Sequence, residues 1–276
     1  MRNLVRKLVP RSFKRAIRRW QERRTKARLF GALAPLVPAV EDMFEGPGSV
    51  EEFKANGEEF LHIYKSVCGL QPNERMLDVG SGIGRKALPL VHYLNEGASY
   101  EGIDVNAFGV EWCRQRITPR FPNFRFQRID VHNPLYNPLG TCPPAEYRFP
   151  FPDESFSFVT LGSVFTHMVP GDVKHYLSEV NRVLSPGRCL ISYFLLNDES
   201  RRLIASGAST QNFGSVRDGY ATISDDLPEN AIAFEEDFVT SLYRELGLRI
   251  ARIDYGSWSG REQSLSYQDH ILAAKD

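Results

Sequence analysis

The hydrophobic positions in the middle of this chain fall into short apolar runs separated by amphipathic stretches. Apolar runs of strand length that alternate with stretches of helical spacing predict an α/β fold, with a mostly parallel sheet and helices on both faces. Strands are expected over residues 76–79, 100–106 and 124–130, within 149–162, and over 189–196, 248–255 and 268–274. Helices are expected over residues 49–69, 86–94, 176–184 and 235–246.

Three glycines, Gly80, Gly82 and Gly84, follow the first predicted strand directly. Glycine permits positive φ angles and lets a ligand approach the backbone closely, and the first turn of the helix expected next has N–H groups free to bind that ligand. The spacing alone fits a dinucleotide, another nucleotide or a tight turn that binds nothing. It departs from Gly-x-Gly-x-x-Gly, the usual dinucleotide spacing.

Two acidic residues narrow these alternatives. Asp78 lies inside the first predicted strand, where its carboxylate would repel a pyrophosphate but could attract an ammonium group. Asp104 ends the next strand, about 20 residues beyond the glycines, at the spacing where a carboxylate accepts the hydroxyl groups of a ribose. A ligand with both a ribose and an ammonium group matches S-adenosylmethionine better than a nicotinamide dinucleotide.

With Asp78-x-Gly80-x-Gly82-x-Gly84, the chain resembles the class I S-adenosylmethionine-dependent methyltransferases. The resemblance continues through 149–162 and the turn at 185–188, and it covers about residues 73–197. Ser157 and Arg188 depart from the family pattern, which has an acid and a glycine there. The resemblance implies a Rossmann-like, seven-stranded sheet, mostly parallel, with an antiparallel strand near the C-terminus.

The resemblance also implies which residues bind S-adenosylmethionine. Asp130, at the end of the third predicted strand, would approach the adenine amino group. The predicted cofactor-binding residues are Asp78, Gly80, Ser81, Gly82, Gly84, Arg85, Asp104, Val105, Asn106, Asp130, Val131 and Ser163. No metal is expected, because no cluster of carboxylates and histidines occurs at the strand ends.

Further stretches, such as 163–167, 257–261 and 267–269, resemble a largely uncharacterised bacterial subgroup of this family. They suggest acceptor-binding residues, with Arg261 able to hold a carboxylate or phosphate, although packing explains Trp258 equally well. The predicted acceptor-binding residues are Tyr136, Asn137, Trp258, Arg261 and Tyr267. His167 follows the fourth strand and is the candidate general base, with a cap or a packing role as the alternative.

Composition fits a globular protein, with 42% hydrophobic and 25% charged residues. The four cysteines have no Cys-x-x-Cys spacing, which suits a reducing, cytoplasmic compartment. The net charge of zero hides a basic N-terminus: residues 1–28 contain twelve Lys or Arg and one acid, Glu22, for a net charge of +11. Apolar residues recur there on one helix face, interrupted by Pro10. Such a segment can lie on the inner face of an anionic membrane, or remain a solvated arm. Contact with nucleic acid and an organelle transit peptide are the weaker alternatives.

We therefore expect a basic arm and linker over residues 1–48 and a methyltransferase domain over 49–276, with lid-like insertions at 132–148 and 197–228. The predicted function is O-methylation of a small molecule or a sugar or glycan by S-adenosylmethionine. One alternative is methylation of a protein or RNA docked on the arm. Another is a cofactor-binding protein without transfer activity.

Overall fold

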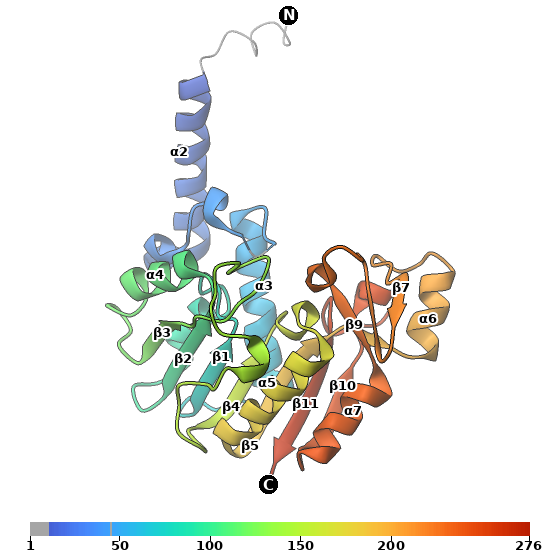
Figure 1. Ribbon diagram of the computed structural model, residues 1–276. Helices are drawn as coiled ribbons and strands as arrows, with labels where there is room; N and C mark the ends of the chain where they lie inside the picture. Colours follow the sequence, from blue (N-terminus) through green and yellow to red (C-terminus); the bar gives the residue numbers. More distant parts are fainter. Residues whose placement is uncertain (1–10, 45) are drawn as a thin grey trace, which may run out of the picture.

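The computed structural model describes residues 11–44 and 46–276, without the side chains of residues 11–14 (Figure 1). Its centre is a seven-stranded sheet with the order β10-β11-β5-β4-β1-β2-β3. β11 is antiparallel to β5 and β10, and the other neighbouring pairs are parallel, as predicted. The strands are β1 (Arg75–Val79), β2 (Ser99–Asp104), β3 (Phe124–Arg128), β4 (Phe156–Leu161), β5 (Leu184–Tyr193), β10 (Arg249–Asp254) and β11 (Asp269–Lys275).

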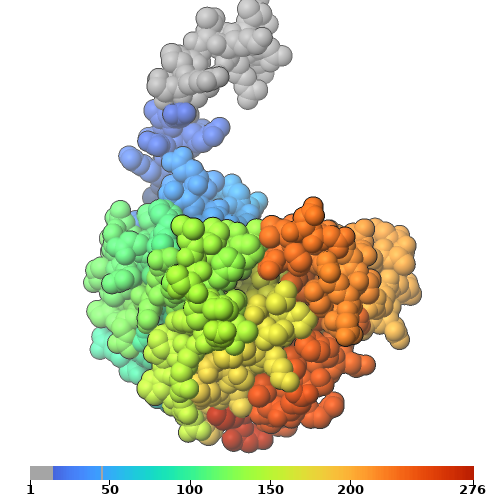
Figure 2. All heavy atoms as spheres, in the orientation of Figure 1, coloured from blue at the N-terminus to red at the C-terminus, as the bar shows by residue number. Residues whose placement is uncertain are grey.

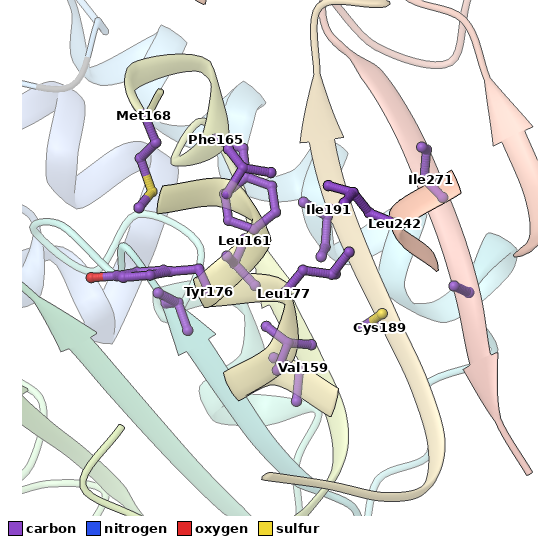
Figure 3. Packing of buried hydrophobic residues seen from close by; sticks show 14 of the residues in the cluster. Val159, Leu161, Phe165, Met168, Tyr176, Leu177, Cys189, Ile191, Leu242 and Ile271 are labelled. Atoms are coloured by element: carbon purple, nitrogen blue, oxygen red, sulfur yellow. The ribbon is translucent and has the colours of Figure 1, made fainter. Parts of the chain in front are cut away.

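Helices cover both faces of this sheet. Apolar residues of α5 (Pro170–Val183) and α7 (Glu236–Glu245) pack on one face, as Figure 3 shows for Leu177 and Leu242 near Ile191 of β5. On the other face lie α4 (Ala107–Arg116) and the π-helical turn η3 (Ile63–Val67), which continues α3 (Val50–His62). Side chains cap two of these helices: Ser49 accepts from the N–H of Glu52, and Asn106 from that of Gly109.

Several predicted boundaries are wrong. Residues 86–94 form no α-helix but a short 3-10 helix, η4 (Leu88–His92), because Pro89 cannot donate a backbone hydrogen bond. β3 ends at Arg128, so Asp130 lies beyond the strand. β5 begins at Leu184 and includes the predicted turn, while the end of the predicted fifth strand, Leu195–Leu196, is a separate strand.

That separate strand, β6, belongs to a second sheet that the sequence patterns did not predict. The sheet has the order β6-β9-β8-β7, with β7 (Ser215–Arg217), β8 (Tyr220–Thr222) and β9 (Ile232–Glu235). Together with α6 (Asp198–Ala205), β7 and β8 make up much of the insertion 197–228. This sheet joins the central one through Asp269, whose buried carboxylate accepts from Leu195 N–H, Gly256 N–H and the Trp258 indole.

The N-terminal segment is a continuous helix, α2 (Arg11–Phe30), that rises from the body (Figures 1 and 2). The predicted linker after it is packed: it contains the 3-10 helices η1 (Gly31–Leu36) and η2 (Val40–Asp42), and Leu36 and Val37 are buried. Pro10 lies outside the described residues, so the predicted interruption of the helix there stays a prediction. In the described part of the chain, no helix is both long and apolar enough to cross a bilayer. The remaining short helices are η5 (Pro144–Glu146), η6 (Phe165–His167), η7 (Pro228–Asn230) and η8 (Ser257–Ser259).

Candidate functional site

A cavity of about 500 Å³ opens at the edge of the central sheet where β1, β2 and β4 end. Ligands of open α/β sheets bind at this edge. Both insertions contribute to the wall, the first through Asn133, Tyr136 and Pro144 and the second through Gln211 and Ile223. The other lining residues are Phe44, Gly46, Val79, Gly80, Arg85, Lys86, Asp104, Val105, Ile129, Val131, His132, Gly162, Ser163, Val164, Thr166, His167, Met168, Tyr176, Phe194, Asn230, Ala231 and Gln268.

The glycine turn forms one end of the cavity. Gly80 has a φ of +78°, and a Cβ at this position would lie 2.4 Å from Val164 Cγ2, so only glycine fits. Gly84 is required for packing instead, since a Cβ there would lie 2.8 Å from Cys113 Sγ. Neither Gly82 nor Gly84 lines the cavity. The turn leads into η4, so the α-helical N-terminus expected to face the ligand is absent from this described segment.

Asp104 ends β2 beside the glycine turn, and its carboxylate lines the cavity. Its Oδ2 accepts the N–H of Gly82 at 2.8 Å, and its Oδ1 accepts the N–H of Asn106 at 2.7 Å. Burial raises the pKa of Asp104, and these two hydrogen bonds oppose that rise. Each carboxylate oxygen keeps a second lone pair, so the oriented carboxylate can accept from two neighbouring hydroxyl groups.

Asp78 is fully buried beneath this turn and does not line the cavity. Its Oδ1 lies 2.9 Å from Lys86 Nζ, and its Oδ2 accepts from the Tyr100 hydroxyl at 2.5 Å. Lys86 Nζ also donates to the Gly80 carbonyl at 3.1 Å. Burial raises the pKa of Asp78, and the charge of Lys86 opposes the rise. The sequence patterns missed Lys86, whose ammonium group already neutralises the carboxylate that we expected to attract a ligand's ammonium group.

A hydroxyl–amide network forms the next part of the wall. Ser163 has a φ of +60°, a strained value for a residue with a side chain, and its N–H donates to Ser192 Oγ at 2.7 Å. The hydroxyl groups of Ser163 and Ser192 both donate to Gln268 Oε1, at 2.8 and 2.7 Å. The amide NH2 is therefore the free donor end of Gln268, which lines the cavity.

His167 lines the cavity from η6, and the ring of Tyr136 lies edge-on to it at 5.8 Å between centroids. Its Nδ1 is 2.8 Å from the carbonyl oxygen of Glu229, so Nδ1 carries the proton and the neutral ring has its lone pair on Nε2. Burial lowers the pKa of His167, against the opposing effect of the Glu229 carbonyl. The residue is therefore neutral near pH 7 and able to accept a proton.

Six of the predicted cofactor residues line the cavity: Gly80, Arg85, Asp104, Val105, Val131 and Ser163. Ser81 is buried behind the turn, and Asn106 caps α4. Asp130 is exposed outside the cavity, where Thr141 donates to it at 2.6 Å and lowers its pKa. Asp130 lies outside the cavity because the chain leaves β3 before it, and its contact with a ligand stays a prediction.

Of the predicted acceptor-binding residues, only Tyr136 lines the cavity. Asn137 is buried and donates to the Val131 carbonyl at 2.9 Å, which holds the insertion 132–148 together. Trp258 is fully buried against Phe194 and Phe213. Both side chains are therefore buried in contacts outside the cavity, and an acceptor-binding role for them stays a prediction.

Arg261 and Tyr267 also lie outside the cavity. The guanidinium group of Arg261 stacks on the Tyr255 ring at 4.3 Å and donates to Asn197 Oδ1 at 3.0 Å. The Tyr267 hydroxyl accepts from Gln211 Nε2 at 2.9 Å. Neither side chain lines the cavity, whereas the adjacent Gln268 does.

Among residues 11–44 and 46–276, no three His, Cys, Asp or Glu side chains gather in a way that could hold a metal ion. Cys68, Cys113 and Cys189 are buried, and burial raises the thiol pKa of Cys68 and Cys189 to about 12. Neither of these two thiols is a reactive nucleophile near neutral pH.

The part of the chain that contains the glycine turn is similar to a known protein family. Residues 77–191 match the family model described as "Methyltransferase domain". The matched region runs from β1 to β5 and contains the glycine turn, Asp104 and His167.

Curated relatives match about half of the chain or less. A phthiotriol/phenolphthiotriol dimycocerosates methyltransferase of Mycobacterium tuberculosis is 35% identical over 114 residues, which are 41% of this chain and 35% of the relative. A fatty-acid O-methyltransferase of Mycolicibacterium smegmatis is 33% identical over 145 residues, 51% of this chain and 44% of the relative. The chain thus spans less than half the length of these relatives.

Solved structures share the fold at low sequence identity. The PH0226 protein from Pyrococcus horikoshii OT3 superposes with a TM-score of 0.56 at 15% identity, covering 82% of this chain and 92% of that one. A SAM-dependent methyltransferase from Archaeoglobus fulgidus gives 0.52 at 16% identity, with coverages of 83% and 95%. The chain therefore shares the Rossmann-like, seven-stranded fold of these structures.

Proposed function

We propose that the protein is a class I, S-adenosylmethionine-dependent methyltransferase that methylates an oxygen atom of a small acceptor with an apolar body, and the match of residues 77–191 to a methyltransferase domain supports this proposal. The cavity at the carboxyl edge of the central sheet carries this proposal. At one end of the cavity lie Gly80, in the glycine turn after β1, and Asp104, at the end of β2. At the other end, His167 and mainly apolar side chains form the wall.

The residues at the turn suit S-adenosylmethionine. Gly80 leaves the space that a Cβ would take, and Asp104 offers oriented acceptors for two ribose hydroxyl groups. Arg85 brings positive charge to the same end, suited to a carboxylate, whereas the charge of Lys86 is balanced by Asp78. When bound, the cofactor supplies a methyl group on a positively charged sulfur.

The opposite end of the cavity suits an acceptor that is apolar apart from its reacting oxygen. Phe194, Ile223 and Ala231 come from the second sheet and its connections, and Met168 comes from the segment after β4. Burying apolar surface here stabilises the complex by about 25 cal/mol per Å². Both curated relatives described above are named as methyltransferases of lipid-like compounds, which supports this acceptor class.

The chain must align the acceptor oxygen, exclude water and accept a proton if that oxygen is a hydroxyl. The lone pair of His167 Nε2 suits proton removal, because hydrogen bonding to Glu229 fixes the other nitrogen. The Gln268 amide can donate to a second oxygen of the acceptor. A carboxylic acid acceptor is already ionised near pH 7 and needs only alignment.

The substitution His167→Ala tests the role of the base. With a hydroxyl acceptor we expect kcat to fall by roughly 10² to 10⁴ and the Kd of S-adenosylmethionine to stay within a factor of about two. The base must be deprotonated, and burial lowers the pKa of His167. The kcat of the wild type should therefore fall only below about pH 6.5. Kinetics with a long-chain alcohol and a long-chain carboxylic acid, and calorimetry for the cofactor, provide the measurements.

His175→Ala is the matched control, because His175 is half-buried outside the cavity and bonds to the Tyr147 carbonyl. It should leave kcat unchanged. A normal kcat in His167→Ala, accompanied by lower stability, would make His167 a packing residue and leave catalysis to alignment. Transfer to a protein or RNA, with none to small acceptors, would instead support the alternative predicted from the basic arm.

A further inference from the structure

Helix α2 carries a dense positive charge that the protein body neutralises only in part. Residues 11–30 contain nine Lys or Arg and one acid, Glu22. Arg19 and Arg28 reach Glu41 and Glu51 at 3.4 Å, and Lys26 pairs with Glu22 at 2.6 Å. Arg15, Arg18, Arg23 and Arg24 are exposed, and no ion pair with a described residue engages them.

Large apolar side chains are exposed among these charges. Ile17 is 41% and Trp20 is 56% exposed, and a spacing of three residues places them on the same face of the helix. The guanidinium group of Arg24, one turn further, lies 4.7 Å from the Trp20 ring centroid. An aromatic ring beside arginines on a helix is the composition that binds at the headgroup level of a bilayer.

The helix is fixed to the body by its other face. Glu22, two residues from Trp20 and so on the opposite side, accepts the N–H of Val40 at 3.2 Å. The linker continues from there to Phe44 and Gly46, which line the cavity. The Trp112 indole holds the same linker by donating to the Leu36 carbonyl at 3.2 Å. The orientation of α2 is therefore coupled to the rim of the cavity.

Figure 1 shows α2 rising on the side of the central sheet where the parallel strands end, opposite the C-terminus of β11. The cavity opens on this same side. We propose that α2 docks the protein on an anionic lipid bilayer, with Trp20 and Ile17 entering the headgroup region and the arginines contacting lipid phosphates. An uncharged bilayer lacks the attraction, and RNA would use the charge but leave Ile17 without a partner.

The test uses the full chain and vesicles without acceptor or cofactor, so that it is independent of the proposed methyl transfer. Sedimentation compares phosphatidylcholine vesicles with vesicles that contain phosphatidylglycerol as a substantial anionic fraction. We expect binding to the anionic vesicles only, weakened as salt rises from roughly 0.1 M to 1 M and the Debye length falls from about 10 Å to about 3 Å. Trp fluorescence should shift to the blue on binding, and Trp20→Phe should abolish this shift.

Two variants with the same change in charge separate docking from general electrostatics. Arg15→Gln/Arg18→Gln/Arg23→Gln/Arg24→Gln should lower partitioning by on the order of tenfold or more. Arg114→Gln/Arg217→Gln/Arg244→Gln/Arg249→Gln removes four exposed arginines from the body and should lower it far less. Circular dichroism checks that both variants are folded.

Equal loss of binding in the two variants, or equal binding of the wild type to neutral and anionic vesicles, would overturn the proposal. So would tighter binding to a mixed-sequence single-stranded RNA than to the vesicles, because it would assign the helix to nucleic acid. A protein that binds vesicles as expected but methylates no small acceptor would contradict the proposed function and leave the docking proposal intact.

Discussion

Asp104 shows how a single carboxylate is prepared for a ligand. Two backbone N–H groups hold its oxygens, so it can offer acceptors without reorganising. The change Asp104→Asn removes the charge and sets an NH2 group against one of these N–H donors. It should weaken S-adenosylmethionine binding by roughly 10- to 100-fold, because hydrogen bonds to a charged acceptor are worth about 1.5–3 kcal/mol. Asp130→Asn, outside the cavity, should change the Kd by less than about twofold. Calorimetric titration measures the Kd of both variants. A larger loss of affinity in Asp130→Asn than in Asp104→Asn would mean that the ribose site is misplaced.

At the same scale, the sequence predicted residues whose role depends on a local motif and missed those fixed by tertiary contacts. Gly80 and Asp104 follow from spacing along two neighbouring strands. The pairing of Lys86 with Asp78 depends on how the chain turns after Gly84, where Pro89 replaces the expected α-helix by η4. Trp258 and Arg261 looked like ligand contacts because large polar or aromatic residues occur both in pockets and in buried networks.

At the scale of the elements, β11 is antiparallel and brings two buried ionisable residues into the sheet. Asp269 faces three N–H donors, whereas neither ring nitrogen of the adjacent His270 forms a hydrogen bond with a described residue. Burial lowers the pKa of His270 to about 4, with Lys86 acting in the same direction and Asp254 in the opposite one. The strand therefore holds a histidine that stays neutral unless the protein unfolds.

This predicts an acid-sensitive fold. The folded pKa of His270 lies below its ordinary value of about 6.5, so the unfolded state binds more protons between the two values. The contribution of His270 is fully present above about pH 6.5 and is lost as the pH falls toward about 4, at a cost of about 3 kcal/mol. Denaturant titrations between pH 7 and pH 4 should show a smaller loss in His270→Leu, whereas exposed His92→Leu should match the wild type. Parallel curves for all three proteins would exclude His270 as the cause.

The elements that sequence patterns predicted well are those with strong periodicity and local caps, such as α3 behind Ser49 and the parallel strands. The second sheet escaped prediction because β7 and β8 are three residues long and lie in a polar segment. β8 is held by pairing with β9 and by packing of Ala221 in a cluster with Phe194 and Trp258, and no local pattern reports such contacts.

At the scale of the whole molecule, the basic helix is attached to the linker that lines the cavity. The linker expected between them is packed, and Glu22 belongs to its anchorage, so a deletion of residues 1–28 would damage the rim of the cavity. A cut that removes residues 1–18 leaves Glu22 and the Arg19–Glu41 and Arg28–Glu51 pairs in place. It takes away Ile17 and seven of the twelve Lys and Arg residues of the segment 1–28.

For this truncated protein we expect two opposite results with one long-chain acceptor. With the acceptor dispersed in a nonionic detergent, kcat/KM should stay within about twofold of the wild type, because no cavity residue has been removed. With the acceptor embedded in anionic vesicles, kcat/KM should fall by roughly tenfold or more, because each lost arginine or lysine near the surface weakens attraction by about 1 kcal/mol. The loss should appear in KM rather than in kcat, since docking raises the local concentration of acceptor and leaves the chemical step unchanged. A similar fall in detergent would show instead that the helix supports the cavity itself. No fall in either assay would show that docking of the helix does not supply the acceptor.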